Sequence, residues 1–214
     1  NQGEPVGGLE TGIVGADISA LKAWKLTECT SNVVIAVLDT GIARNHEDLR
    51  EGLWKNSREK AENGKDDDAN GYVDDVQGWN FVDGNADIAD HRGHGTFCTG
   101  LIVADKNNGK GSRGLAPLSR VMPLKIVSDA GAATTATAVE AIDYAVANGA
   151  KILSLSSRFF EAKNLLRIAL PSTLYSVNFS LLIKFLIAER ALEVVTNCSQ
   201  FGDGLAFFAV IIST

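Results

Sequence analysis

The sequence is short of cysteines and of long apolar runs, and each shortage excludes a class of protein. Its 214 residues include three cysteines, too few and too scattered for a disulfide framework or a zinc cluster. The uncharged run from 168 to 183 is followed by Lys184 and falls short of the ~18 to 20 apolar residues of a membrane-spanning helix. Basic residues are also in deficit. The net charge of −6 argues against a nucleic-acid partner and favours acidic loops that hold cations.

Glycine is almost missing from the last quarter of the chain. Residues 1–156 hold 19 of the 21 glycines, whereas residues 157–214 hold 2. Phenylalanine has the opposite distribution, with 7 of 9 in the later part. We therefore divide the chain into an N-terminal part, 1–156, and a C-terminal part, 157–214.

Three apolar runs rich in β-branched residues predict buried parallel strands. The first, VVIAVL, ends at Asp39, and the others cover residues 121–127 and 151–155. A helical pattern lies between the last two runs, so they form a βαβ unit. The sequence therefore predicts an α/β fold with a mostly parallel central sheet.

The connecting helix is predicted from the segment TATAVEAIDYAVANG. Val139, Ile142 and Val146 share one face at helical spacing. Thr137 and Glu140 stand at the spacing of a capping box at its start.

Asp39 and His94 carry the clearest catalytic pattern. Asp39 follows a buried strand, at the sheet edge where α/β proteins bind ligands. His94 stands between two glycines and begins a predicted helix that can return to the same edge. A buried carboxylate on one imidazole nitrogen fixes the tautomer, while the other nitrogen takes a proton from a hydroxyl. The structural alternative is that Asp39 caps a turn and His94 caps a helix.

The Asp-Thr-Gly sequence at Asp39 also occurs in aspartic peptidases, where two such aspartates share a proton. That interpretation requires Ser or Thr after the glycine, and Ile42 stands there. It also leaves the His-Gly-Thr at His94 unexplained.

Three segments stand in a characteristic order and spacing, namely VVIAVLDTGIARNHEDL, DHRGHGTFCTGLI and RGLAPLSRVMPLKIV. In these segments the chain resembles the subtilisin-like serine proteases, above all the thermitase-type and bacterial subtilisin-type members. The resemblance runs from about Gly15 to Ser156. It implies a subtilisin-like three-layer fold, serine endopeptidase activity through an Asp/His/Ser triad, Asp39 as the orienting acid and His94 as the general base. It further implies a protein or peptide substrate, a propeptide inhibitor in a zymogen, and a secreted or extracellular location. We expect a monomer. Cys98, one helical turn after His94, is expected to be a packing residue.

The nucleophile of this family stands in a Gly-Thr-Ser run, and the sequence contains none. Its only Gly-Thr is Gly95-Thr96. The resemblance ends at Arg158. We therefore interpret residues 157–214 as a divergent or shortened C-terminal part of a subtilase that lacks the serine motif. We expect this fold to be incomplete there and the 214-residue chain to be inactive. The alternative function is a non-catalytic, calcium-stabilised pseudoprotease or peptide-binding remnant.

The run KDDDANGYVDD places five aspartates in eleven residues, which would repel one another without a counter-charge. Its alternation of carboxylates and an amide, with Gly71 at a turn, matches the start of an EF-hand-type loop. The alternative is a solvated acidic loop. The predicted calcium ligands are Asp66, Asp68, Asn70, the carbonyl of Tyr72, and Asp75 or its neighbour Asp74.

Two more sites are implied by the resemblance alone. The first is a second calcium site formed by Asp48, Asn108 and carbonyls of residues 106–112, beside which Lys106 and Lys110 place positive charge. The second is the substrate edge, which pairs with an extended peptide as an added strand. Its residues are Gly131, Ala132, Ala133 and Ser156.

Overall fold

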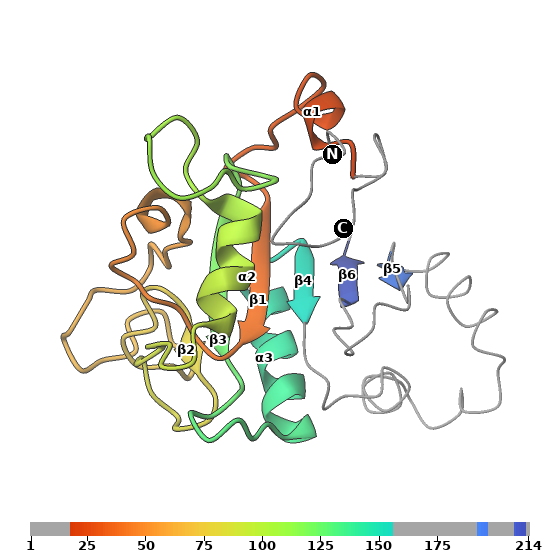
Figure 1. The fold of residues 1–214 in the computed structure, drawn as a ribbon. Helices are drawn as coiled ribbons and strands as arrows, with labels where there is room; N and C mark the ends of the chain where they lie inside the picture. Colours follow the sequence, from red (N-terminus) through yellow and green to blue (C-terminus); the bar gives the residue numbers. More distant parts are fainter. Residues whose placement is uncertain (1–17, 156–191, 197–207, 213–214) are drawn as a thin grey trace, which may run out of the picture.

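The computed structural model of the protein describes residues 18–155, 192–196 and 208–212, and Figure 1 shows their arrangement. Within these residues no helix is both long and apolar enough to span a membrane. The helices are α1 (Ala20–Ala23), the 3-10 turn η1 (Arg50–Gly52), α2 (His94–Val103) and α3 (Thr135–Ala147). The strands are β1 (Val34–Asp39), β2 (Trp79–Asn80), β3 (Arg120–Lys125), β4 (Ile152–Leu155), β5 (Leu192–Thr196) and β6 (Phe208–Ile212).

The strands form one sheet in the order β2-β3-β1-β4-β6-β5. The first four strands in this order pair in parallel, and β6 pairs antiparallel with both β4 and β5. The mostly parallel α/β sheet predicted from the sequence is therefore confirmed. The three predicted strands correspond to β1, β3 and β4, and the helix predicted to begin near His94 is α2.

Alternate side chains of β1 point to opposite faces of the sheet, as the two-residue period of a strand requires. Ile35 and Val37 belong to an apolar cluster that contains Cys98 and Val103 of α2. Ala36 and Leu38 belong to a second cluster, which contains the buried alanines of α3. The sheet is thus the middle of three layers, with α2 on one face and α3 on the other (Figure 1).

The buried face of α3 matches the prediction only in part, because Ile142 packs against the core whereas Val146 does not. Small residues and one tyrosine pack against the sheet, namely Ala138, Ala141, Tyr144 and Ala145. Val146, predicted to face the core, is exposed. The N-cap is Thr134, whose hydroxyl accepts the backbone N–H of Thr137, so the predicted capping pair of Thr137 and Glu140 is wrong by one turn.

Removing core volume from the sheet should cost more than removing it from the outer face of α3. Leu124 of β3 is fully buried, so Leu124→Ala should lower the free energy of unfolding by about 2 to 5 kcal/mol. Val146→Ala, on the exposed side of α3, should change it by about 0.5 kcal/mol or less. Urea unfolding measures both. Equal losses would contradict the assigned core.

Candidate active site

Asp39 is the last residue of β1 and lies where the parallel strands end. Its side chain is 4% exposed, and its Oδ1 accepts a 2.7 Å hydrogen bond from the backbone N–H of Thr40. In the sheet register it lies opposite Lys125, the last residue of β3. The sheet therefore delivers a buried carboxylate to the edge at which α/β folds bind ligands.

His94 is the first residue of α2 and contacts this carboxylate directly. Its Nδ1 lies 2.7 Å from Oδ1 and 2.9 Å from Oδ2 of Asp39. A carboxylate only accepts hydrogen bonds, so Nδ1 is the donor and Nε2 is the proton acceptor of the neutral ring. The His94 side chain is 38% exposed, which places the imidazole between the buried carboxylate and solvent. The structure brings the two predicted residues together, and their catalytic roles stay a prediction.

Glycine at position 95 permits this contact. A Cβ on Gly95 would lie 2.3 Å from the carbonyl oxygen of Gly41 and 3.1 Å from the Cβ of Asp39. Any side chain there would push the start of α2 away from the end of β1. The glycine that follows the histidine is therefore a steric requirement of the Asp39–His94 bond.

Cys98 lies beneath the imidazole, one turn into α2. Its Sγ is 3.8 Å from Nδ1 and 4.0 Å from Nε2 of His94. The side chain is buried in the same apolar cluster as Ile35 and Val37. These contacts support the predicted packing role, in which the thiol fills the space between the helix and the sheet.

Lys125, which was not predicted from the sequence, is a buried cation beside this site. Its Nζ donates to the carbonyls of Thr40 (2.7 Å) and Ala89 (3.2 Å) and to Oδ1 of Asp129 (2.8 Å). This last bond lowers the pKa of Asp129 below its usual value. Three acceptors satisfy the three donors of the ammonium group. The available signal was a charged residue at the end of the apolar run VMPLK, four residues before an aspartate.

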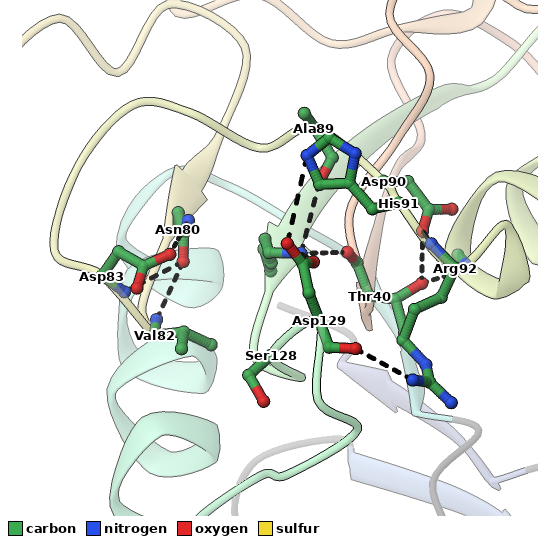
Figure 2. A network of polar contacts seen from close by, with 12 residues as sticks. Thr40, Asn80, Val82, Asp83, Ala89, Asp90, His91, Arg92, Ser128 and Asp129 are labelled. Atoms are coloured by element: carbon green, nitrogen blue, oxygen red, sulfur yellow. Dashed lines mark hydrogen bonds and ion pairs between the residues drawn. The ribbon is translucent and has the colours of Figure 1, made fainter.

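The predicted substrate edge follows β3. Val127 and Ala133 form an antiparallel bridge, and the backbone N–H of Ser128 donates to the carbonyl of Ala132 (2.8 Å). The guanidinium of Arg92 lies against Gly131 and donates to the carbonyl of Asp129, as Figure 2 shows. Gly131, Ala132 and Ala133 thus form one bent segment beside Arg92, in the loop that leads to His94. Ser156 lies outside the described residues.

The acidic loop is wound around Asp66. Its Oδ1 accepts the N–H of Asn70 (3.0 Å) and its Oδ2 accepts the N–H of Gly71 (2.7 Å). Gly71 has a φ of 94°, a conformation that glycine adopts without strain. The Tyr72 N–H donates to Oδ1 of Asn70 (2.8 Å). These bonds close residues 66–72 into a tight turn.

Glu59, which was not predicted from the sequence, contacts this loop. The side chain is 8% exposed. Its Oε1 accepts the backbone N–H groups of Asp67 (2.7 Å) and Asp68 (3.0 Å), whereas Oε2 is buried without a hydrogen-bond partner. Glu59, Asp66 and Asp68 each offer an oxygen within 4.8 Å of the others. Arg58 neutralises part of this charge through a 3.0 Å contact with Asp68.

Asp75 is not a member of this three-carboxylate group, although it shares the Asn56 amide with Asp68. Its Oδ1 accepts from the amide of Asn56 (2.9 Å), and its Oδ2 accepts from the amide of Asn70 (2.9 Å) and the hydroxyl of Tyr144 (2.6 Å). Burial and this last bond raise the pKa of Tyr144. The predicted ligand Asp75 is therefore a fully buried hydrogen-bond acceptor between the loop and α3.

Asp48 and Asn108, the predicted second calcium pair, are in contact. Oδ1 of Asp48 accepts from the amide of Asn108 (2.6 Å), and its Oδ2 accepts the N–H of Ser112 (3.1 Å). The two nearby lysines have acidic partners of their own. Lys106 pairs with Glu28, and Lys110 pairs with Glu47.

A buried carboxylate bound to Nδ1 of a half-exposed imidazole is the arrangement of an acid–base pair in hydrolytic enzymes. The model of the subtilase family matches residues 30–158, and the chain belongs to this family. Thermitase of Thermoactinomyces vulgaris is 34% identical over 139 residues, 65% of this chain and 42% of thermitase. Subtilisin-like protease 1 of Plasmodium berghei is 31% identical over 195 residues, 90% of this chain and 30% of that protein.

The chain spans less than half the length of these two relatives, because it covers 42% and 30% of them. Among solved structures, a lanthipeptide protease superposes with a TM-score of 0.45 at 21% identity. That match covers 69% of this chain and 36% of the other.

Substitution of Gly95 should separate Asp39 from His94, since a Cβ at this position meets backbone at 2.3 Å. We expect Gly95→Ala to remove the far-downfield proton resonance of a hydrogen-bonded His94 Nδ1–H. Gly100→Ala is the matched control in the same helix, because its Cβ would meet only Leu49 Cδ2, at 3.9 Å. Proton NMR of folded protein checks both variants. An unchanged resonance in Gly95→Ala would contradict the steric requirement.

Proposed function

We propose that Asp39 and His94 are the acid–base half of a subtilisin-type serine endopeptidase. The observation that carries the proposal is the 2.7 Å contact between Asp39 and Nδ1 of His94 at the carboxyl edge of the sheet, in a chain of the subtilase family. In this role Nε2 of His94 takes the proton of a serine hydroxyl and returns it to the leaving amine. Asp39 holds the reactive tautomer and stabilises the imidazolium.

The substrate in this proposal is a protein or peptide in extended conformation. Residues 131–133 offer the edge along which such a chain adds as a strand, and this edge lies beside the His94 loop. Family membership supports three further proposals, namely a secreted or extracellular location, a propeptide inhibitor and a monomeric protein.

The printed sequence contains no Gly-Thr-Ser, so we propose that these 214 residues do not hydrolyse peptides by themselves. Loss of one triad member leaves about 10³ to 10⁴-fold catalysis over water from the rest of an intact site. The alternative function is a calcium-stabilised module that binds peptides without cleaving them. The segment at 131–133 and the acidic loop serve that function equally well.

Calcium is proposed for the acidic loop, with Glu59, Asp66 and Asp68 as the ligands that the geometry supports best. Calcium prefers carboxylate oxygens, and an unpartnered buried oxygen on Glu59 beside two further carboxylates needs a counter-charge. Asn70, the carbonyl of Tyr72 and Asp75 are the other ligands proposed for this loop from the sequence. Asp48 and Asn108 are proposed as a second, separate calcium site.

A serine-directed fluorophosphonate probe tests the proposed activity. The 214-residue chain should be labelled no faster than its His94→Ala variant, because no serine stands in a Gly-Thr-Ser sequence. A version of the protein that contains this sequence in frame should be labelled, and His94→Ala should abolish the labelling. Stoichiometric, His94-dependent labelling of the 214 residues would overturn the proposal that they are inactive.

Calcium should bind the loop and raise the free energy of unfolding by about 2.7 kcal/mol at a hundredfold excess over Kd. Glu59→Gln should weaken binding at least about tenfold, or ~1.4 kcal/mol, and should not destabilise the calcium-free protein, because it removes charge repulsion. Glu62→Gln, in the exposed part of the same segment, is the matched control. Isothermal titration and thermal unfolding measure these effects. Absence of heat at millimolar calcium would refute the site.

Asp68→Ala should weaken calcium binding more than Asp67→Ala. Asp68 belongs to the three-carboxylate group, whereas Asp67 accepts from the N–H of Lys60 and the amide of Asn63 on the other side of the loop. Titration of both variants distinguishes a specific site from general attraction to an acidic loop, which would weaken equally in both.

A further inference from the structure

Asp90 accepts five hydrogen bonds from the two segments that carry Asp39 and His94. Its Oδ1 accepts from the hydroxyl of Thr40 (2.8 Å) and from the backbone N–H groups of Arg92 (3.0 Å) and Gly93 (2.8 Å), as Figure 2 shows in part. Its Oδ2 accepts from the backbone N–H (2.9 Å) and the hydroxyl (2.7 Å) of Thr96. Burial opposes ionisation of this carboxyl, but these bonds outweigh it and lower the pKa of Asp90 to about 2.

The two threonines that donate to Asp90 also link the two segments to each other. Thr40, next to Asp39, accepts the N–H of Gly95 in α2 through its hydroxyl oxygen (2.9 Å). Thr96, in α2, accepts the N–H of Ala43 after the β1 turn through its own hydroxyl oxygen (3.0 Å). The links are reciprocal, since each segment supplies one hydroxyl and one backbone donor.

The carboxylate sets the direction of both links. A hydroxyl has one proton and two lone pairs. Because Thr40 and Thr96 each direct that proton to Asp90, their lone pairs are left to accept from the opposite segment. An acceptor-only group at position 90 therefore orients both hydroxyls, and neither orientation depends on a catalytic side chain.

We propose that Asp90 is a positioning residue that holds His94 against Asp39 by orienting the Thr40 and Thr96 hydroxyls across the β1–α2 contact. The inference rests on the proposed function only in that the Asp39–His94 pair is taken as the acid–base pair. Asp90 itself touches neither of the two side chains in the hydrogen bonds described above. It acts through the backbone on either side of His94.

An amide at position 90 cannot reproduce this arrangement. Asparagine has one acceptor oxygen and one NH₂ group, so one side of it would present donors to donors. If its oxygen takes the place of Oδ1, its NH₂ faces the backbone N–H of Thr96, which cannot reverse. The Thr96 hydroxyl then turns a lone pair toward the amide, and its proton no longer fixes the lone pair that accepts the N–H of Ala43. Asp90→Asn should therefore loosen the contact between β1 and α2, although the side chain at position 90 keeps its shape.

Proton and nitrogen NMR of the 214-residue chain tests this proposal without relying on catalysis. The parent chain should show the far-downfield His94 Nδ1–H resonance and a single Nδ1–H tautomer at neutral pH. Asp90→Asn should lose the resonance and show a mixture of the two tautomers. Asp87→Asn is the matched control, because it removes the same charge three residues away, where the carboxylate accepts the Ala89 N–H of an exposed turn. It should behave as the parent.

A second pair of variants covers the case in which Asp90→Asn does not fold. Thr96→Ser retains the hydroxyl and should keep the parent's His94 signals, whereas Thr96→Val removes the hydroxyl and should lose them. A folded Asp90→Asn or Thr96→Val with the parent's resonance and tautomer overturns the proposal. So does failure of Thr96→Val to fold, which would show that these bonds maintain the fold and not the pair specifically. A parent chain without the resonance overturns both the positioning role and the Asp39–His94 bond, whereas the labelling experiment alone decides whether the pair is catalytic.

Discussion

The site depends on one close contact, between the end of β1 and the start of α2. A buried carboxylate is costly unless it is paired or hydrogen-bonded, and Asp39 is 4% exposed. His94 satisfies it, and only a glycine at position 95 lets the helix come close enough. The remainder of α2 is held against the sheet, because Cys98 and Val103 pack on its apolar face. The geometry of the Asp39–His94 contact thus follows from the sheet, the glycine and the helix packing together.

The sheet was predictable because its signal is local. Buried parallel strands are continuous apolar runs, and β1, β3 and β4 each coincide with one. The orientation of α3 was not predictable from apolarity, which favoured Val139, Ile142 and Val146. The face that packs on the sheet consists of three alanines and Tyr144, with Ile142 packed beside them. Which side of the helix meets the sheet is decided by tertiary packing, and the periodicity of the sequence does not contain that information.

The candidate site likewise contains residues that local sequence predicts and residues that only the folded chain brings into place. Asp39 and His94 were predictable because one ends a strand, the other begins a helix, and the strand end and the helix start lie at one sheet edge. Glu59 and Lys125 were not, since their value depends on partners brought by the folded chain. Glu59 stands seven residues before the acidic run and reaches it only because its Oε1 binds backbone N–H groups of that run.

Four buried or half-buried carboxylates show how their partners determine what each can do. Asp90 is saturated by five neutral donors, so it remains ionised and acts as a fixed structural anion. Asp75 accepts hydrogen bonds from two amides and a tyrosine hydroxyl, which hold it between the loop and α3. Asp39 has a titratable partner, and that is the arrangement required for moving a proton. Glu59 alone has a buried oxygen without any partner, and it lies beside two further carboxylates. The unpartnered oxygen of Glu59, rather than the number of acidic residues, is therefore what supports the proposed calcium site in this part of the loop.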